Sequence, residues 1–166
     1  MGYIDLHVHS NKSDGTLSPT EVVSRAAERG LSAIALTDHD CVAGVSEACA
    51  AAKKLSASNK SLRVISGVEI SADYKNRDIH ILGLFVDTEN PALFNALNSA
   101  LKARDKRNEK MVKNLQDAGL EITMEDLLFG TDETVITRAH FARHLLAKGY
   151  VKTWEEAFPK YLDSTT

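Results

Sequence analysis

The first residues that could carry chemistry lie near the N-terminus, where residues 5–14 read DLHVHSNKSD. On a β-strand, side chains two residues apart point to the same face and lie roughly 6.5 Å apart along the chain. His7 and His9 therefore project together, with Asp5 on the same side. Two imidazoles at that separation can converge on one metal ion, at metal–nitrogen distances of about 2.0–2.1 Å. The pair also fits a half-buried strand whose solvent face carries polar residues, so it leaves both interpretations open.

Further titratable residues accompany the next apolar segments. His39 follows one such segment, Glu69 lies late in another, and His80 lies in a fourth. Because ligands gather where the carboxyl ends of parallel strands meet, we expect these groups to lie close together, joined by Asp14 from a Ser-Asp-Gly turn. Taken alone, His80 also fits a strand with one hydrogen-bonded histidine, and Asp14 also fits a turn residue that bonds to the backbone.

The types of these residues indicate which metals they would bind. Imidazole and carboxylate ligands without thiolate favour Zn, Mn or Fe. More than four candidate ligands indicate more than one ion, and a carboxylate such as Glu69 can bridge two of them.

The elements that must position these residues alternate between short apolar segments and helical patterns, which is typical of βα units and a mostly parallel sheet. The predicted strands are Tyr3–Val8, Ser32–Leu36, Arg63–Ile70 and Ile79–Val86. Ser18, Pro19 and Glu21 predict a helix start with a capping box, and Gly30 predicts its end. A second helix is predicted over Val45–Ala57.

From Pro91 onward the pattern is helical throughout. Helices are predicted from Pro91 to about Ala118 and over 124–129, 137–148 and 154–162. The composition changes near residue 88, which predicts two parts, 1–88 and 89–166.

Composition narrows the class of protein. With 166 residues, of which 43% are hydrophobic, the chain can bury a real core. A net charge of −3, from 20 basic and 23 acidic residues, makes no general case for binding nucleic acid. Residues 102–113 hold six basic and two acidic side chains, which fits a solvated helix.

Cysteine content and hydropathy bear on the compartment. Cys41 and Cys49 are too few for a disulfide framework, which favours a reducing environment. No leader segment or apolar run of about 20 residues is evident, so we expect a soluble, cytoplasmic protein without a membrane partner.

Several segments carry a family resemblance. DLHVHSNKSDG, ALTDHD, GVEIS and DIHILG, in this order, resemble the first motifs of the PHP (polymerase and histidinol phosphatase) family. ITRAHFARHLLAKG and FPKYL are similar to the insertion of small bacterial PHP phosphoesterases that hydrolyse nucleoside 3′,5′-bisphosphates and short RNA 5′ ends. The resemblance implies an α/β fold, the N-terminal part of a distorted (β/α)₇ barrel with an inserted helical subdomain.

The resemblance also implies a ligand set for up to three divalent ions, commonly manganese, with zinc, iron or magnesium as alternatives. His7, His9 and Glu69 would hold the first ion, Glu69 and His80 the second, and Asp14 and His39 the third. Family members complete the site with later motifs, an AHPG-like one and an Asp-x-His pair, which are not found in this sequence. We therefore expect the C-terminal barrel portion to be absent from this chain.

A smaller group lies on the predicted helix 137–148. His140 and His144 share a helix face, as residues four apart do, which fits either a solvated surface or a metal pair. Resemblance to the bisphosphatase branch implies that Arg138 and His140 bind the substrate phosphate that is not cleaved. The planar guanidinium of arginine matches phosphate oxygens.

The predicted function is a metal-dependent phosphoesterase in which a metal-activated water attacks phosphorus. His39 would combine ligation with orientation of the leaving group, and Asp40 would support it or carry a proton. Resemblance to the bisphosphatase branch implies that the substrate is a small nucleotide or short oligonucleotide. No aromatic residues accompany the basic stretch, so we expect no stacking on long single strands.

Two alternatives remain open at this stage, a histidinol-phosphate phosphatase of the same family and a truncated metal-binding or regulatory module without activity. The sequence does not predict the oligomeric state.

Overall fold

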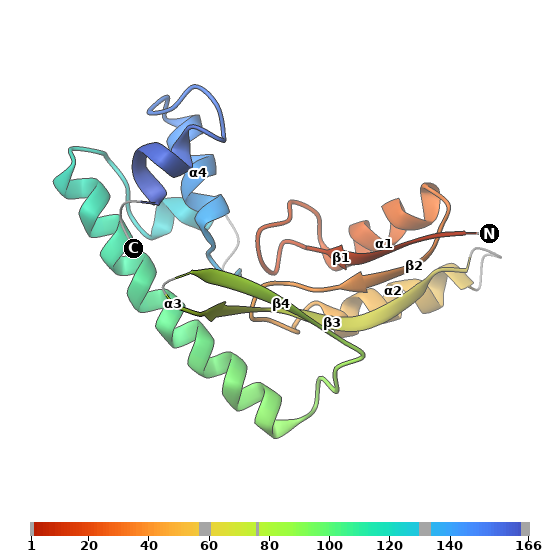
Figure 1. Cartoon of the computed structure of the whole chain (residues 1–166). Coiled ribbons are helices and arrows are strands. Elements are labelled where there is room, and N and C mark those ends of the chain that lie inside the picture. The colour runs from red at the N-terminus through yellow and green to blue at the C-terminus, as the bar shows by residue number, and fades with distance from the viewer. Residues whose placement is uncertain (1, 57–60, 76, 130–133, 164–166) are drawn as a thin grey trace. The chain divides into compact units, whose positions relative to one another are not determined.

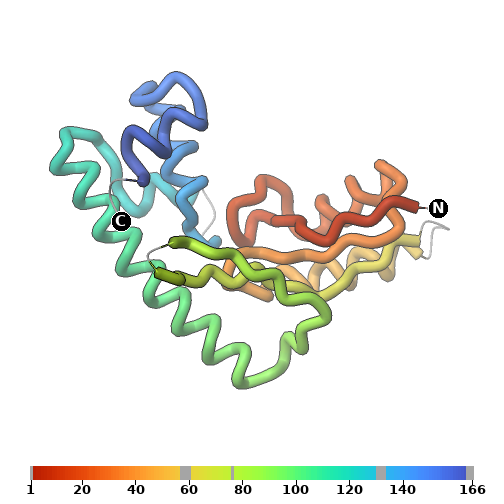
Figure 2. Tube along the Cα trace, viewed as in Figure 1, coloured from red at the N-terminus to blue at the C-terminus, as the bar shows by residue number. Residues whose placement is uncertain are grey.

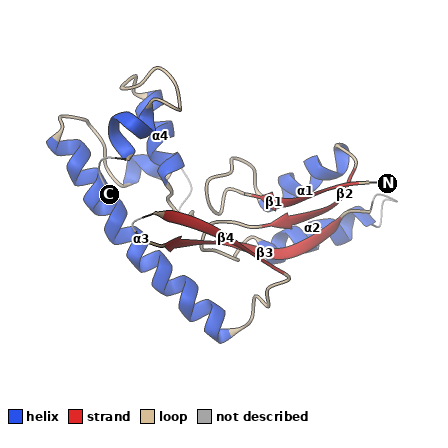
Figure 3. Cartoon of the chain, in the orientation of Figure 1, coloured by secondary structure: helices blue, strands red, loops and turns tan. Residues whose placement is uncertain are grey.

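The computed structural model describes residues 2–56, 61–75, 77–129 and 134–163. It divides the chain into two compact units, Met1–Ala100 and Leu101–Thr166. The described strands all lie in the first unit, and only helices and loops follow them (Figure 3). The division falls inside one continuous helix, α3 (Pro91–Asp117). The predicted parts 1–88 and 89–166 concern a barrel and its insertion, and that division stays a prediction.

The first unit is built on a mixed sheet of four strands in the order β1-β2-β3-β4 (Figure 1). They are β1 (Tyr3–Val8), β2 (Leu31–Leu36), β3 (Arg63–Asp73) and β4 (Asp78–Leu84). β1, β2 and β3 are parallel, whereas β4 is antiparallel to β3. Each strand lies within a few residues of its predicted bounds. Three of the four strands run parallel, which confirms the prediction of a mostly parallel sheet.

The direction of β4 corrects one expectation about the site. His80 lies in the first half of β4 opposite Ser71, and not at the carboxyl end of a parallel strand. Backbone hydrogen bonds between Tyr74 and Arg77 join the end of β3 to the start of β4, and the two strands run side by side (Figure 2). A parallel connection would have needed a crossover of a dozen or more residues. His80 therefore reaches Glu69 as its diagonal neighbour across a hairpin.

The first helix starts and ends where its capping residues predict. In α1 (Pro19–Glu28), the Ser18 hydroxyl accepts from the Glu21 N–H, and the Glu21 carboxylate accepts from the Ser18 N–H at 2.8 Å. Gly30 follows the helix with a φ of +74°, a conformation that costs glycine little. α2 spans Val45–Ser56, and its predicted last residue, Ala57, lies outside the described residues.

α1 and α2 pack against each other on one face of the sheet, and the core forms between them and β2. Its buried residues come from both helices, from β2 and from the segment before β3: Val22, Val23, Ala26, Ile34, Leu36, Ala48, Ala51, Ala52 and Leu62.

The second unit has a core of its own. It contains the later part of α3, the 3₁₀ turn η1 (Glu125–Leu127), α4 (Arg138–Ala147) and the π-helical turn η2 (Phe158–Leu162). The buried core residues are Met111, Val112, Leu115, Leu120, Ile122, Leu127, Phe141, Ala142, Leu145, Val151, Ala157 and Leu162. η1 and η2 are shorter than the helices predicted over 124–129 and 154–162. Across the described residues, no helix is both long enough and apolar enough to cross a membrane.

Candidate metal centre

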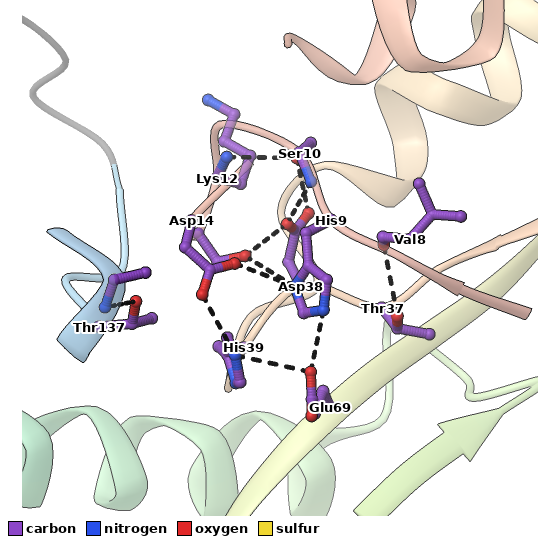
Figure 4. A network of polar contacts seen from close by, with 12 residues as sticks. Val8, His9, Ser10, Lys12, Asp14, Thr37, Asp38, His39, Glu69 and Thr137 are labelled. Carbon is purple, nitrogen blue, oxygen red and sulfur yellow. Dashed lines mark hydrogen bonds and ion pairs between the residues drawn. The ribbon is translucent and has the colours of Figure 1, made fainter. Parts of the chain in front are cut away.

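Glu69 of β3 is the centre of a group of histidines in the first unit (Figure 4). Its side chain is 3% exposed, and its Oε2 lies 2.9 Å from His7 Nε2 and 3.0 Å from His9 Nε2. Its other oxygen, Oε1, lies 2.8 Å from His80 Nδ1. His39 Nε2 is 3.6 Å from Oε2. Both oxygens of one buried carboxylate therefore face imidazole nitrogens.

Asp14 extends this group on the side of the β1–α1 loop. Its Oδ1 lies 3.3 Å from His9 Nδ1, and its Oδ2 lies 3.4 Å from His39 Nε2. The rings of His7, His9, His39 and His80 follow one another in that order, with neighbouring centroids 4.9–5.0 Å apart. The structure thus brings together all six residues predicted as metal ligands.

Backbone pairing next to the sheet sets the position of Glu69. Its N–H donates to the Asp38 carbonyl at 3.1 Å, and its carbonyl accepts from the Asp40 N–H at 2.9 Å. This pairing continues the parallel ladder of β2 and β3 as an isolated bridge between His39 and Glu69. His39 and Glu69 therefore lie side by side on neighbouring segments of the chain.

The surroundings of His9 and Glu69 favour the protonation states in which these side chains can bind a metal ion. Burial lowers the pKa of His9 below its ordinary value, against the attraction of Asp14, which would raise it. Burial alone would raise the pKa of Glu69. The hydrogen bond from His7 and the charges of His39, His7 and His9 outweigh it and hold the pKa of Glu69 below its ordinary value. A neutral imidazole and an ionised carboxylate are the forms that bind metal ions.

The residues present fit divalent ions. Three groups place one ligand atom per residue within 4.8 Å of one another: His7, His9 and Glu69; His9, Asp14 and His39; His39, Glu69 and His80. The ion-pair partners of Glu69 among the described residues are all histidines, so no lysine or arginine there takes the place of a cation. Nitrogen and oxygen donors without sulfur suit Mn, Zn or Fe. The assignment of residues to individual ions stays a prediction.

Asp40, predicted as a catalytic residue, lies beside this group but is not in any of the three ligand sets. It is fully buried, its φ is +49°, and its Oδ1 accepts from the Ser71 N–H at 2.9 Å. Its carboxylate therefore braces the β3 backbone two residues beyond Glu69. Its catalytic role stays a prediction.

The sequence predictions gave no role to Asp38 and Ser13. Both are buried. Ser13 lies in the β1–α1 loop, where its hydroxyl donates to Asp38 and lies 3.2 Å from His9 Nδ1. The loop also needs Gly15, because a Cβ there would lie 2.6 Å from the His9 carbonyl oxygen. The sequence signal for Asp38 was an acidic residue next to His39, but Asp38 and Asp40 both meet that description.

Arg138 and His140 lie at the start of α4 in the second unit. His140 completes a capping box, in which its Nδ1 accepts from the Thr137 N–H at 3.1 Å. A backbone N–H can only donate, so Nδ1 of His140 carries no proton. His144 commits its Nε2 to the Glu121 carbonyl, at 3.1 Å. These backbone bonds disfavour the metal pair on this helix. Phosphate binding by Arg138 and His140 stays a prediction.

Comparison with known proteins places this geometry in context. Residues 5–163 match the family model described as PHP domain. The chain is 42% identical over 163 residues to the 3′,5′-nucleoside bisphosphate phosphatase of Chromobacterium violaceum, a match that covers 98% of this chain and 55% of that protein. It is 42% identical over 158 residues to a 5′-3′ exoribonuclease of Haemophilus influenzae, covering 95% of this chain and 56% of that protein.

A solved structure shows the same likeness. A candidate metal-dependent phosphoesterase from Bifidobacterium adolescentis superposes with a TM-score of 0.86 at 31% identity, over 98% of this chain and 56% of that chain. The chain thus spans about half the length of the curated relatives it matches.

Proposed function

The chain belongs to the PHP domain family, and on that premise we propose that it provides the metal centre of a phosphoesterase that hydrolyses phosphate esters of small nucleotides. The observation that carries the proposal is the Glu69 carboxylate, buried and faced on both oxygens by histidine nitrogens at 2.8–3.0 Å. A bridging carboxylate of this kind is typical of sites that hold two ions a few ångströms apart.

The proposed ligand sets are those that the family resemblance implies, and the residues of each set lie within one of the three groups described above. His7, His9 and Glu69 would hold one ion, Glu69 and His80 a second, and Asp14 and His39 would contribute to a third. Bound divalent ions acidify water and neutralise negative charge on phosphate oxygens.

The chain's own residues supply the remaining roles. His39, 9% exposed at its side chain, would orient the leaving group. Asp40 would carry a proton or support His39, and its bond to the Ser71 N–H holds it in place.

The proposed substrate is a nucleoside 3′,5′-bisphosphate or the 5′ end of a short RNA. The names of the relatives from C. violaceum and H. influenzae, a nucleoside bisphosphate phosphatase and a 5′-3′ exoribonuclease, support this class. Arg138 and His140 would bind the phosphate that is not cleaved. A guanidinium fork and a ring N–H are both suitable donors to phosphate.

We also propose manganese as the ion and the cytoplasm as the compartment. Imidazole and carboxylate donors support manganese among the alternatives of zinc, iron and magnesium. The described cysteines are unbridged, and burial raises the pKa of the Cys41 thiol, so it stays protonated and unreactive. An unreactive free thiol is compatible with a reducing compartment.

Phosphate release by the full natural chain tests the function. The protein is stripped of metal, reloaded with Mn²⁺ and given adenosine 3′,5′-bisphosphate, a short 5′-phosphorylated RNA or histidinol phosphate. We expect release from the first two substrates and loss of that release after His9→Ala or renewed chelation. Full activity of the variant, or of the chelated protein, would contradict the mechanism.

The same assay separates the alternatives. A preference for histidinol phosphate would favour the histidinol-phosphate phosphatase. Metal binding without phosphate release from any of the three substrates would favour a metal-binding module.

A further inference from the structure

Asp38 is a buried carboxylate that fastens the β1–α1 loop to the end of β2 (Figure 4). Its Oδ1 accepts from the Ser10 N–H at 2.7 Å and from the Ser13 hydroxyl at 2.7 Å. Its Oδ2 accepts from the Ser10 hydroxyl, also at 2.7 Å. Asp38 is 2% exposed, and Ser10 and Ser13 are buried with it. Short hydrogen bonds to an ionised group are among the stronger ones in proteins.

Ser13 connects this carboxylate to His9. A serine hydroxyl has a single proton, and a carboxylate can only accept, so the proton of Ser13 points to Asp38. Lone pairs of the Ser13 oxygen are then left for His9 Nδ1, which lies 3.2 Å away. A hydrogen bond forms there only if Nδ1 carries a proton. Asp14 Oδ1, 3.3 Å from the same nitrogen, favours the same arrangement.

The other ring nitrogen of His9 faces the candidate metal centre. A neutral imidazole with its proton on Nδ1 has its lone pair on Nε2. In His9 that atom lies 3.0 Å from Glu69 Oε2, on the side where the ligand atoms converge. Histidines that bind metals commonly donate their other N–H to an acceptor that fixes the orientation of the ring.

We propose that Asp38 is a positioning residue which, through Ser13, holds His9 with its proton on Nδ1 and so presents Nε2 as the ligand atom. This rests on the proposal that His9 binds a metal ion. The hydrogen-bond relay consists of the chain's own residues and needs no metal ion, so it can be tested separately in protein stripped of metal.

Ser10 and Ser13 form a matched pair for the test. Each hydroxyl donates to Asp38 at 2.7 Å, but Ser13 also contacts His9. Ser10 additionally accepts from the Lys12 N–H at 3.2 Å, so Ser10→Ala also removes two hydrogen bonds of the loop. The affinity of each variant for Zn²⁺ is measured by calorimetry on the full natural chain. We expect Ser13→Ala to weaken the binding of Zn²⁺ by roughly 10–100-fold and Ser10→Ala to weaken it by less than about threefold.

Nitrogen NMR of the histidine rings in metal-free protein supplies a readout that does not depend on metal. Asp14→Ala removes the second acceptor at His9 Nδ1, so the relay through Ser13 must then hold the proton by itself. We expect the Nδ1–H signal of His9 to persist in Asp14→Ala and in Asp14→Ala with Ser10→Ala, and to be lost in Asp14→Ala with Ser13→Ala.

The outcomes separate the two proposals. Equal weakening by both serine variants, or loss of the Nδ1–H signal in Asp14→Ala alone, would overturn the positioning role of Asp38. If the unsubstituted protein fails to bind Zn²⁺ but the Nδ1–H signals follow the expected pattern, the relay stands and the proposed metal site is what fails.

Discussion

His9 in the first unit and His140 in the second are both largely buried histidines, yet their neighbours commit the same ring atom in opposite ways. Nδ1 of His9 faces acceptors, Ser13 and Asp14. Nδ1 of His140 faces a donor, the Thr137 N–H. The first arrangement leaves a lone pair on Nε2, suited to a cation, and the second leaves an N–H on Nε2, suited to an anion. The hydrogen-bonding neighbours of a histidine, and not the residue type alone, therefore decide whether its ring can bind a cation or an anion.

The largest expected effect is a loss of metal binding in the first unit that leaves His140 in the second unit unchanged. Glu69→Gln keeps the shape of the side chain but removes the charge that four histidines surround. We expect Mn²⁺ affinity to fall by more than the roughly 10–100-fold typical of residues that only support a ligand, with the ring signals of His140 unchanged. Calorimetry and nitrogen NMR measure the two effects. Glu28→Gln, the same change on the exposed surface of α1, is the matched control and should retain full affinity.

The next test concerns the proposed anion donor. Glutamine at position 140 can accept from the Thr137 N–H and still offer an N–H, whereas glutamate can only accept. We expect His140→Glu to raise the KM for adenosine 3′,5′-bisphosphate by roughly 10–100-fold, the range for losing a hydrogen bond to a charged group. His140→Gln should stay near the unsubstituted value. Equal KM values for the two variants would remove the donor role, and Mn²⁺ affinity should not change in either.

A smaller effect is expected at the starts of α1 and α4. Both helices begin with a capping box, but the third helical residue is a glutamate in α1 and a histidine in α4. Ser18 with Glu21 caps α1, and Thr137 with His140 caps α4. Ser18→Ala and Thr137→Ala should each lower the free energy of unfolding by about 1 kcal/mol. Chemical denaturation measures both. Since Thr137→Ala keeps the backbone N–H, the His140 tautomer seen by NMR should survive it, and a change of tautomer would show that the hydroxyl matters more than the N–H.

The smallest effect is a pH dependence of the metal-free protein. The pKa of His9 is lower in the folded chain, so the unfolded chain binds the proton more readily. Stability from this residue therefore declines as pH falls through the ordinary histidine value of about 6.5. Glu69, whose folded pKa is also lowered, loses its contribution only at more acidic pH, below the ordinary glutamate range. Between pH 7.5 and 5.5 we expect a lower melting temperature, with a smaller decrease in His9→Gln. An identical decrease in His9→Gln would show that another group causes the pH dependence.

Local signals predicted much of this structure. The Ser18-Pro19 pair and Gly30 fixed both ends of α1, because caps act within a few residues of the sequence. The predicted α/β PHP fold, covering part of a barrel, is confirmed by the structural likeness. The six predicted ligands lie together because the ends of β1 and β2 meet beside β3 and because His80 reaches Glu69 across the hairpin of β3 and β4.

The parts that were not predicted depend on contacts between segments. His39 lies between two acids, and sequence cannot say which one faces the β1–α1 loop. The positive φ of Asp40 breaks the simple alternation, so Asp38 contacts Ser10 and Ser13 whereas Asp40 contacts Ser71. The antiparallel direction of β4 could have been read from its short connection to β3, since a parallel partner needs a longer one.

The hairpin of β3 and β4 also has a consequence for the order in which the site forms. Glu69 and His80 are eleven residues apart and meet across one turn, an arrangement that isolated hairpins reach in about 1–10 μs. His7 and His9 reach Glu69 only after two parallel crossovers, and such distant contacts form slowly. We expect pulsed hydrogen exchange during refolding to protect β4 before β1. His7 and His9, which leave the ribosome before Glu69 and His80, would then join the site after them.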